Sequence, residues 1–255
     1  MIKNIVVTAV ILLLTFNTNA QSDTIYLKKN VNIVGKYHVN SKDETIINVL
    51  VDSRDGNIYK VIKIGEQIWM AENLKYLPNV VGSSVGSETK PYYYVSGYQG
   101  TNVSEAKTHT NYKTYGVLYN WPAAMNGDVS STTNPSGVQG ICPCDWHLPS
   151  DAEWTQLTDY LDTSVAGGKL KEAGTTHWDS PNIGATNETG FTALPGNYRD
   201  NEGVFVTIGE DCDLWSATEK DGNYSWFRNI HYNDRDVGRN NFNKKIGFSV
   251  RCVKD

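Results

Sequence analysis

The sequence has few cationic side chains for its length, and they form no stripe. Lysine and arginine number 23 against 28 aspartates and glutamates, so the net charge is −5 at pH 7. A surface that binds nucleic acid or an anionic membrane needs clustered cations to neutralise phosphates. The composition therefore argues against nucleic acid as a partner and disfavours anionic membranes.

Long hydrophobic runs are also scarce, because the chain has only one, at its beginning. An apolar run covers residues 5–16 after Lys3, and Thr18 and Ala20 are small or polar residues that follow it. This layout is typical of a secretory signal peptide. A membrane span needs about 20 apolar residues, more than this run provides. We predict a signal peptide over residues 1–20, a secreted or cell-surface protein, and no transmembrane segment after cleavage.

Cysteine is rare and occurs at four positions, which are Cys142, Cys144, Cys212 and Cys252. No cysteine lies near the predicted cleavage point, which argues against a lipoprotein. An even number in an exported chain predicts two disulfides, and the sequence alone allows three pairings. A zinc site on the Cys-Pro-Cys segment with nearby His147 is disfavoured, because a second paired knuckle is missing.

Signs of catalysis are weak. No Gly-x-Ser-x-Gly motif marks a nucleophile, and we interpret His147 and His177, each beside a tryptophan, as packing residues. Two acidic pairs that we interpret as exposed loop acids are Glu210 with Asp211 and Asp234 with Asp236. We therefore expect neither an enzyme active site nor a cofactor.

The remaining composition is that of a folded domain. Aromatic residues make up 11% of the chain, with 7 tryptophans and 15 tyrosines, which excludes disorder for most of its length. Residues 24–51 are polar with short β-type runs. We predict an N-terminal extension or edge strands over residues 21–50 and one domain over residues 51–255.

One helix is well signalled. Ser150 and Glu153 form a capping box, and the apolar stripe that follows at helical spacing consists of Trp154, Leu157 and Leu161. A shorter helix is predicted over residues 168–173, and a loop over residues 82–100. Strands are predicted over residues 59–64, 67–71, 115–121, 190–194, 203–208, 214–219, 224–232 and 248–253. The first two are predicted to form a hairpin around a Gly-containing turn, and the third to end at Pro122. Many strands with one or two helices indicate an α+β fold.

An ordered set of motifs carries a family resemblance. The motifs are DSRDGNIYKVIKIGEQIWMAENL, YGVLYNW, GICPCDWHLPSDAEW, AGGKLKEAG, ATNETGFTALPGNYR, LWSATE and GFSVRCVKD. Over residues 51–255 the chain resembles the Fibrobacter succinogenes major paralogous domain family, a secreted family of Bacteroidetes-type bacteria. The resemblance implies a C-type lectin-like α+β fold with small twisted antiparallel sheets, one or two helices and long loops. No established reaction comes with it.

The resemblance also bears on the cysteines. Family members usually have one cysteine before the Trp-His-Leu-Pro turn and one in the last strand, which implies a disulfide between Cys142 and Cys252. The remaining pair would then be Cys144 with Cys212. The distantly similar formylglycine-generating enzymes use a reactive cysteine pair near the C-terminus, where this chain has only Cys252. We do not expect that activity.

Calcium-dependent sugar binding is not supported by the motifs. The C-type lectin signatures Glu-Pro-Asn or Gln-Pro-Asp, followed by Trp-Asn-Asp, are absent, and Asn233-Asp234 follows Tyr232 rather than tryptophan. A structural Ca²⁺ bound by backbone carbonyls and Asp or Asn side chains is compatible with the sequence but not signalled.

One stretch favours a binding surface. Residues 221–243, DGNYSWFRNIHYNDRDVGRNNFN, mix aromatic, arginine and asparagine side chains, a combination suited to adaptable recognition. The candidate ligand-binding residues are Tyr224, Trp226, Arg228, His231, Tyr232, Asn233, Arg235, Arg239 and Asn240. Because side chains alternate along a strand, half of them could belong to the core instead.

We therefore predict a secreted or cell-surface binding module for an extracellular polysaccharide, glycoprotein or surface protein. The alternative is a structural or adhesion assembly subunit that docks through residues 24–51, where an exposed strand edge would accept another strand. An enzyme of unknown type is the third hypothesis. The sequence leaves the ligand and the oligomeric state open.

Overall fold

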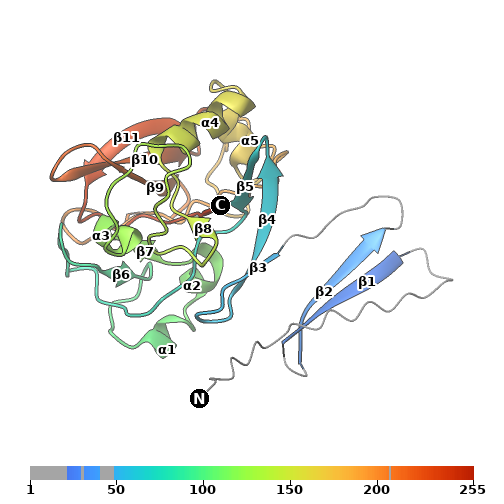
Figure 1. Ribbon diagram of the computed structural model, residues 1–255, viewed down its shortest axis with the longest axis horizontal. Helices are drawn as coiled ribbons and strands as arrows, with labels where there is room; N and C mark the ends of the chain where they lie inside the picture. The colour runs from blue at the N-terminus through green and yellow to red at the C-terminus, as the bar shows by residue number, and fades with distance from the viewer. Residues whose placement is uncertain (1–21, 30–31, 41–48, 207) are drawn as a thin grey trace, which may run out of the picture. The chain divides into compact units, whose positions relative to one another are not determined.

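The computed structural model describes residues 22–29, 32–40, 49–206 and 208–255 (Figure 1). The chain divides into two compact units, Met1–Ile47 and Asn48–Asp255. The predicted signal peptide lies outside the described residues. Within the described ranges, no helix is both long and apolar enough to cross a membrane.

The first unit contains one antiparallel pair, β1 (Ser22–Lys29) with β2 (Asn32–Asn40). The register shifts between Leu27 and Lys28, so the pair contains an irregularity at that point. Both strands fall in the segment that the sequence predicts to be an extension or edge strands.

The second unit is a mixture of small antiparallel sheets and short helices. Its largest sheet has the order β3-β4-β5-β12-β8. The strands of this sheet are β3 (Val49–Val51), β4 (Ile58–Ile64), β5 (Gln67–Met70), β8 (Trp146–His147) and β12 (Val253–Lys254). The predicted hairpin is confirmed, because β4 and β5 pair around Gly65 and Glu66. Gly65 has a φ of +59°, a conformation that glycine adopts without strain.

The second sheet carries most of the candidate binding residues. Its order is β11-β10-β9, with β9 (Asp211–Glu219), β10 (Tyr224–His231) and β11 (Gly238–Asn243). A further pair joins β6 (Tyr93–Tyr94) to β7 (Leu118–Tyr119). The predicted strand over residues 190–194 is wrong, and so is the one over 203–208 for its described residues, 203–206 and 208. These residues form loops with isolated bridges.

The predicted main helix is confirmed as α4 (Asp151–Leu161). Both hydrogen bonds of the capping box between Ser150 and Glu153 are present. Trp154 is fully buried, stacks 4.6 Å from Trp69 and donates its ring N–H to the carbonyl of Trp215. The second helix, α5 (Ala166–Leu170), begins two residues before the predicted one.

Three short helices were not predicted, namely α1 (Val103–Ala106), α2 (Thr110–Tyr115) and α3 (Trp121–Met125). The prediction of a strand over residues 115–121 is correct only for β7. Asn120 caps α3 through the N–H of Ala123, and Pro122 lies in the first turn of this helix, where a missing N–H costs nothing. We had interpreted Pro122 as the end of a strand.

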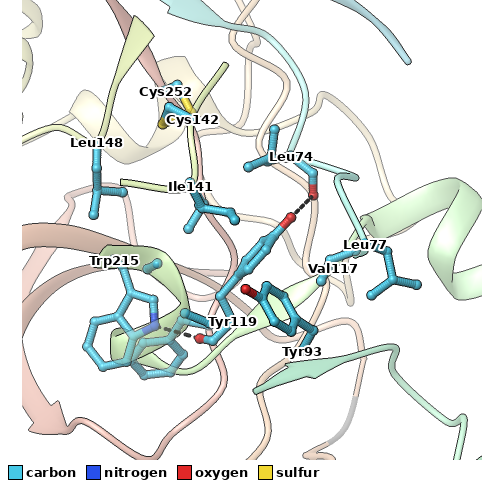
Figure 2. Packing of buried hydrophobic residues seen from close by; sticks show 14 of the residues in the cluster. Leu74, Leu77, Tyr93, Val117, Tyr119, Ile141, Cys142, Leu148, Trp215 and Cys252 are labelled. Carbon is cyan, nitrogen blue, oxygen red and sulfur yellow. Dashed lines mark hydrogen bonds between the residues drawn. A yellow bond between two sulfur atoms is a disulfide. The ribbon is translucent and has the colours of Figure 1, made fainter. Parts of the chain in front are cut away.

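Two apolar clusters make up the core. The larger one gathers residues from β7, β9 and the segment before β8, and Figure 2 shows Tyr119 at its centre. The Trp215 ring N–H donates to the carbonyl of Tyr119 at 2.8 Å. The second cluster lies between α4, α5 and β9 and contains Trp69, Trp154 and Cys212. Both clusters contain residues of β9 and β10, so the three-stranded sheet is packed against both of them.

One disulfide crosses the larger cluster. Cys142 and Cys252 are bonded with their Cα atoms 5.9 Å apart, and both are fully buried (Figure 2). The pairing of Cys144 with Cys212 is wrong, because both are free cysteines. Cys144 is exposed in a turn, whereas Cys212 lies in the second cluster, where burial raises the pKa of its thiol to about 12.

We expect native protein to react with a thiol reagent at Cys144 alone, since Cys212 is buried. Unfolding without a reductant should expose Cys212, and a reductant should then release Cys142 and Cys252. Reduction should destabilise the protein by about 2–5 kcal/mol, because the bond closes a long loop in the unfolded chain. Peptide mapping of each labelled form tests this order. Labelling of Cys142 or Cys252 in the native, unreduced protein would contradict it.

Candidate binding surface

The candidate strand β10 presents two different faces. A turn at Asp221 starts it, because the carboxylate of Asp221 accepts hydrogen bonds from the N–H groups of Asn223 and Tyr224 at 3.0 Å. Phe227 is 4% exposed and packs on Phe248 with ring centroids 4.5 Å apart. Tyr224 and Trp226 alternate with these core residues, and Tyr224 is 40% exposed. Over residues 224–227, one face of the strand is therefore core and the other is available.

Arg228 is not available, which corrects its assignment as a ligand-binding residue. Its side chain is 2% exposed although it lies on the same face as Trp226. The guanidinium donates to the carboxylate and carbonyl of Asp151 and to the hydroxyl of Thr155. Arg228 therefore joins β10 to the first turn of α4, and its role is structural.

Arg239 lies across the strand pair from Arg228 and has a different environment. Its guanidinium stacks on the Trp226 ring at 3.6 Å and donates three hydrogen bonds to the Asp151 carboxylate, at 2.8, 2.9 and 3.1 Å. Its side chain is nevertheless 48% exposed. Burial opposes ionisation of Asp151, but the hydrogen bonds and charges of Arg239 and Arg228 outweigh it and hold the pKa of that carboxyl below its usual range.

We call this region the β10–β11 surface, defined as Tyr224, Trp226, Arg239 and Asn241. The register pairs Trp226 with Asn241, so these two side chains share a face. Asn241 accepts a hydrogen bond from Lys220 at 3.1 Å. Asn240 is exposed, but it pairs with Phe227 and therefore lies on the opposite face, apart from this surface. The surface combines an ordered aromatic–arginine stack with the Asn241 amide, which suits recognition of a polar ligand.

The other candidates lie apart from this surface. His231 is five residues beyond Trp226, which at 3.3 Å per residue places it about 16 Å along the strand. His231 and Tyr232 are half-buried with ring centroids 4.6 Å apart, and Asn233 and Arg235 are exposed. The structure therefore divides the nine candidates between two ends of β10.

A buried lysine fixes the far end. Lys171 is fully buried, and its ammonium donates to four backbone carbonyls, those of Ile183, His231, Tyr232 and Asp234, at 2.8–3.4 Å. Burial lowers the pKa of Lys171 to about 8, against the opposing charge of Asp234. The ammonium therefore holds the turn after β10 in place.

Two arginines from other motifs act in the same way. Arg199 is 2% exposed and donates to the carbonyls of Ser83 and Lys245 at 2.7 and 3.1 Å. Arg251 is 1% exposed and donates to the carbonyls of Phe191 and Thr192 and to the side chain of Asn73. These motif residues build the scaffold and do not line the β10–β11 surface.

His147 of the Trp-His-Leu-Pro turn is held by two acids. Its ring nitrogens lie 2.6 Å from a carboxylate oxygen of Glu153 and 2.6 Å from one of Asp255. Burial opposes the charged ring, but the hydrogen bonds and charges of Glu153 and Asp255 outweigh it and raise the pKa of His147. The residue links the capping box of α4 to the C-terminus, which is more than the packing role we predicted.

We expect the His147 network to contribute less to stability as the pH rises. A histidine whose pKa is raised by folding contributes stability that is complete below its unfolded pKa of about 6.5 and is lost as pH rises through the folded value. Urea unfolding of the wild type should therefore show decreasing stability above that pH. His147→Gln should be less stable than the wild type at low pH. Its stability should not show the decrease that comes from deprotonation of His147. An unchanged pH profile in the variant would contradict the assignment.

The acidic pairs differ from each other. Asp234 and Asp236 are exposed, as predicted, whereas Glu210 and Asp211 are half-buried. Asp211 is the first residue of β9 and lies opposite His231 in the strand register. Sequence reasoning also missed Asp151, which contacts residues 77 and 88 positions away. Its place after Ser150 indicates only a helix N-terminus.

Comparison with known families identifies the chain. The family model of the Fibrobacter succinogenes major domain matches residues 62–254. The chain therefore belongs to the Fibrobacter succinogenes major domain family, as the motifs predict. The comparison with curated proteins and the comparison with solved structures both return no match.

Proposed function

We propose that this chain is an exported, non-enzymatic binding module that recognises an extracellular glycan or protein through the β10–β11 surface. The observation that carries the proposal is the stack of Arg239 on Trp226. Asp151 holds the guanidinium in place on this stack. An aromatic and an arginine that are already ordered lose little entropy on binding, which is a property of interface hot spots.

Export is part of the proposal. Disulfides form and persist in oxidising compartments, and the Cys142–Cys252 bond lies in the core of the second unit. The predicted signal peptide provides the route. We also propose that the second unit has a C-type lectin-like fold, since its small antiparallel sheets, short helices and long loops accord with what the family resemblance implies.

Substitutions on the surface should separate binding from folding. Glycan and protein arrays probed with the mature protein provide the ligand. Trp226→Ala and Arg239→Ala should then each weaken its retention at least about tenfold, as loss of a hot-spot residue does. Thermal melting and circular dichroism should change little, because both side chains are partly exposed.

Two matched variants control this experiment. Tyr160→Ala removes an aromatic that is 66% exposed on α4 and should leave both binding and stability unchanged. Arg228→Ala breaks a buried ion pair and should destabilise the fold by about 3–5 kcal/mol. If Trp226→Ala and Arg239→Ala retain the array ligand as well as Tyr160→Ala does, the β10–β11 surface is not the binding site.

One observation favours assembly as a second function. Among the described residues, β1 and β2 pair only with each other and form a two-stranded sheet. An isolated hairpin is marginally stable, and its open edges can accept a strand from another chain. Concentration-dependent oligomers of the mature protein, together with unchanged binding in the surface variants, would support this function over the first.

A further inference from the structure

Three possible metal ligands converge at the far end of β10. One ligand atom each from Glu210, Asp211 and His231 lies within 4.8 Å of the others. The convergence follows from the sheet, because the antiparallel register of β9 and β10 places His231 directly opposite Asp211. Glu210 precedes Asp211 in the chain. A strand pair is a rigid support, so these side chains do not meet by the chance placement of a flexible loop.

Neighbouring groups orient the two central ligands. The Asn229 amide donates to one oxygen of Asp211 at 2.9 Å and to Asp213 at 2.7 Å. This hydrogen bond fixes the Asp211 carboxylate and leaves its second oxygen for another partner. The end of β10 that carries His231 is held by Lys171, whose ammonium donates to the carbonyl of His231 itself at 3.1 Å. Such outer contacts are what position metal ligands in proteins.

The cluster also has an excess of negative charge. Glu210 and Asp211 are both half-buried. No lysine or arginine in the described part of the chain forms an ion pair with either carboxylate. Carboxylates that are partly removed from water without a cationic partner are costly. A bound cation would supply that partner.

The histidine ring indicates which nitrogen would bind. Nδ1 of His231 accepts a hydrogen bond from the N–H of Asn233 at 3.2 Å and lies 3.8 Å from a carboxylate oxygen of Asp234. Nε2 is therefore the nitrogen left for a ligand. When a metal binds Nε2, the ring keeps its proton on Nδ1. The Nδ1–H group then donates a hydrogen bond to an acceptor such as Asp234, in the carboxylate–histidine–metal arrangement common in metal sites. The bond from Asn233 is given up, which limits the affinity.

We propose that Glu210, Asp211 and His231 form a binding site for a divalent transition-metal ion of the zinc class, with water completing the coordination. An imidazole with two carboxylates suits Zn²⁺, Mn²⁺ or Co²⁺, whereas Ca²⁺ takes oxygen ligands. His231 is 30% exposed, so an ion has access from solvent. The site is separate from the β10–β11 surface and does not depend on the proposed function.

Zinc titration of the full mature chain, without an affinity tag, tests this site. Isothermal titration calorimetry should show one saturable Zn²⁺ per chain, and the melting temperature should rise with Zn²⁺ concentration. His231→Gln and Asp211→Asn should each weaken Zn²⁺ binding at least about tenfold. Asp234→Asn should weaken it less, because Asp234 contacts the ring and not the ion. Co²⁺ in place of Zn²⁺ should give a visible spectrum that His231→Gln changes.

A second histidine–carboxylate pair provides the matched control. His177 lies 2.9 Å from Glu172 and is also 30% exposed, so His177→Gln should bind Zn²⁺ like the wild type. Circular dichroism of each variant checks that it folds. The proposal is overturned if the wild type shows no saturable Zn²⁺ binding. It is equally overturned if His231→Gln and Asp211→Asn bind as well as His177→Gln.

Discussion

The main constraint on this structure is that backbone carbonyls buried inside its loops need hydrogen-bond donors. Much of the second unit consists of loops packed against small sheets, and a buried carbonyl without a donor is costly. Lys171, Arg199 and Arg251 supply the donors from inside the core. Each is at most 2% exposed. They supply the hydrogen bonds that regular pairing supplies in long helices and sheets. The far end of β10 depends on one of them, Lys171.

This constraint explains how the family motifs relate to function. The AGGKLKEAG, GNYR and SVRC segments contribute the three cations, and the Trp-His-Leu-Pro segment contributes the His147 network and the disulfide. The motifs thus build the scaffold. Residues that face solvent on β10 and β11 belong to none of these interactions.

The sequence alone predicted those elements whose determinants are local. The capping box of α4 and the β4–β5 hairpin were predicted because their determinants lie within a few residues. The short helices α1 to α3 were missed, since their caps are single Asn or His residues. The division of β10 into two ends was also missed. It depends on the contacts that Asp151 and Lys171 make with residues of β10 that are 60 or more positions away in the chain. A periodic sequence pattern carries no information about contacts between such distant residues.

The most direct measurement compares Lys171→Met, at the residue that follows α5, with Lys169→Met in the last turn of that helix. Lys169 has a side chain that is 31% exposed and forms an ion pair with exposed Glu188. Lys171→Met keeps the apolar stem but leaves buried carbonyls without a donor, so denaturant unfolding should show a loss of at least about 2 kcal/mol. Lys169→Met should change the free energy of unfolding by no more than about 0.5 kcal/mol. Equal, small effects of the two substitutions would contradict the account.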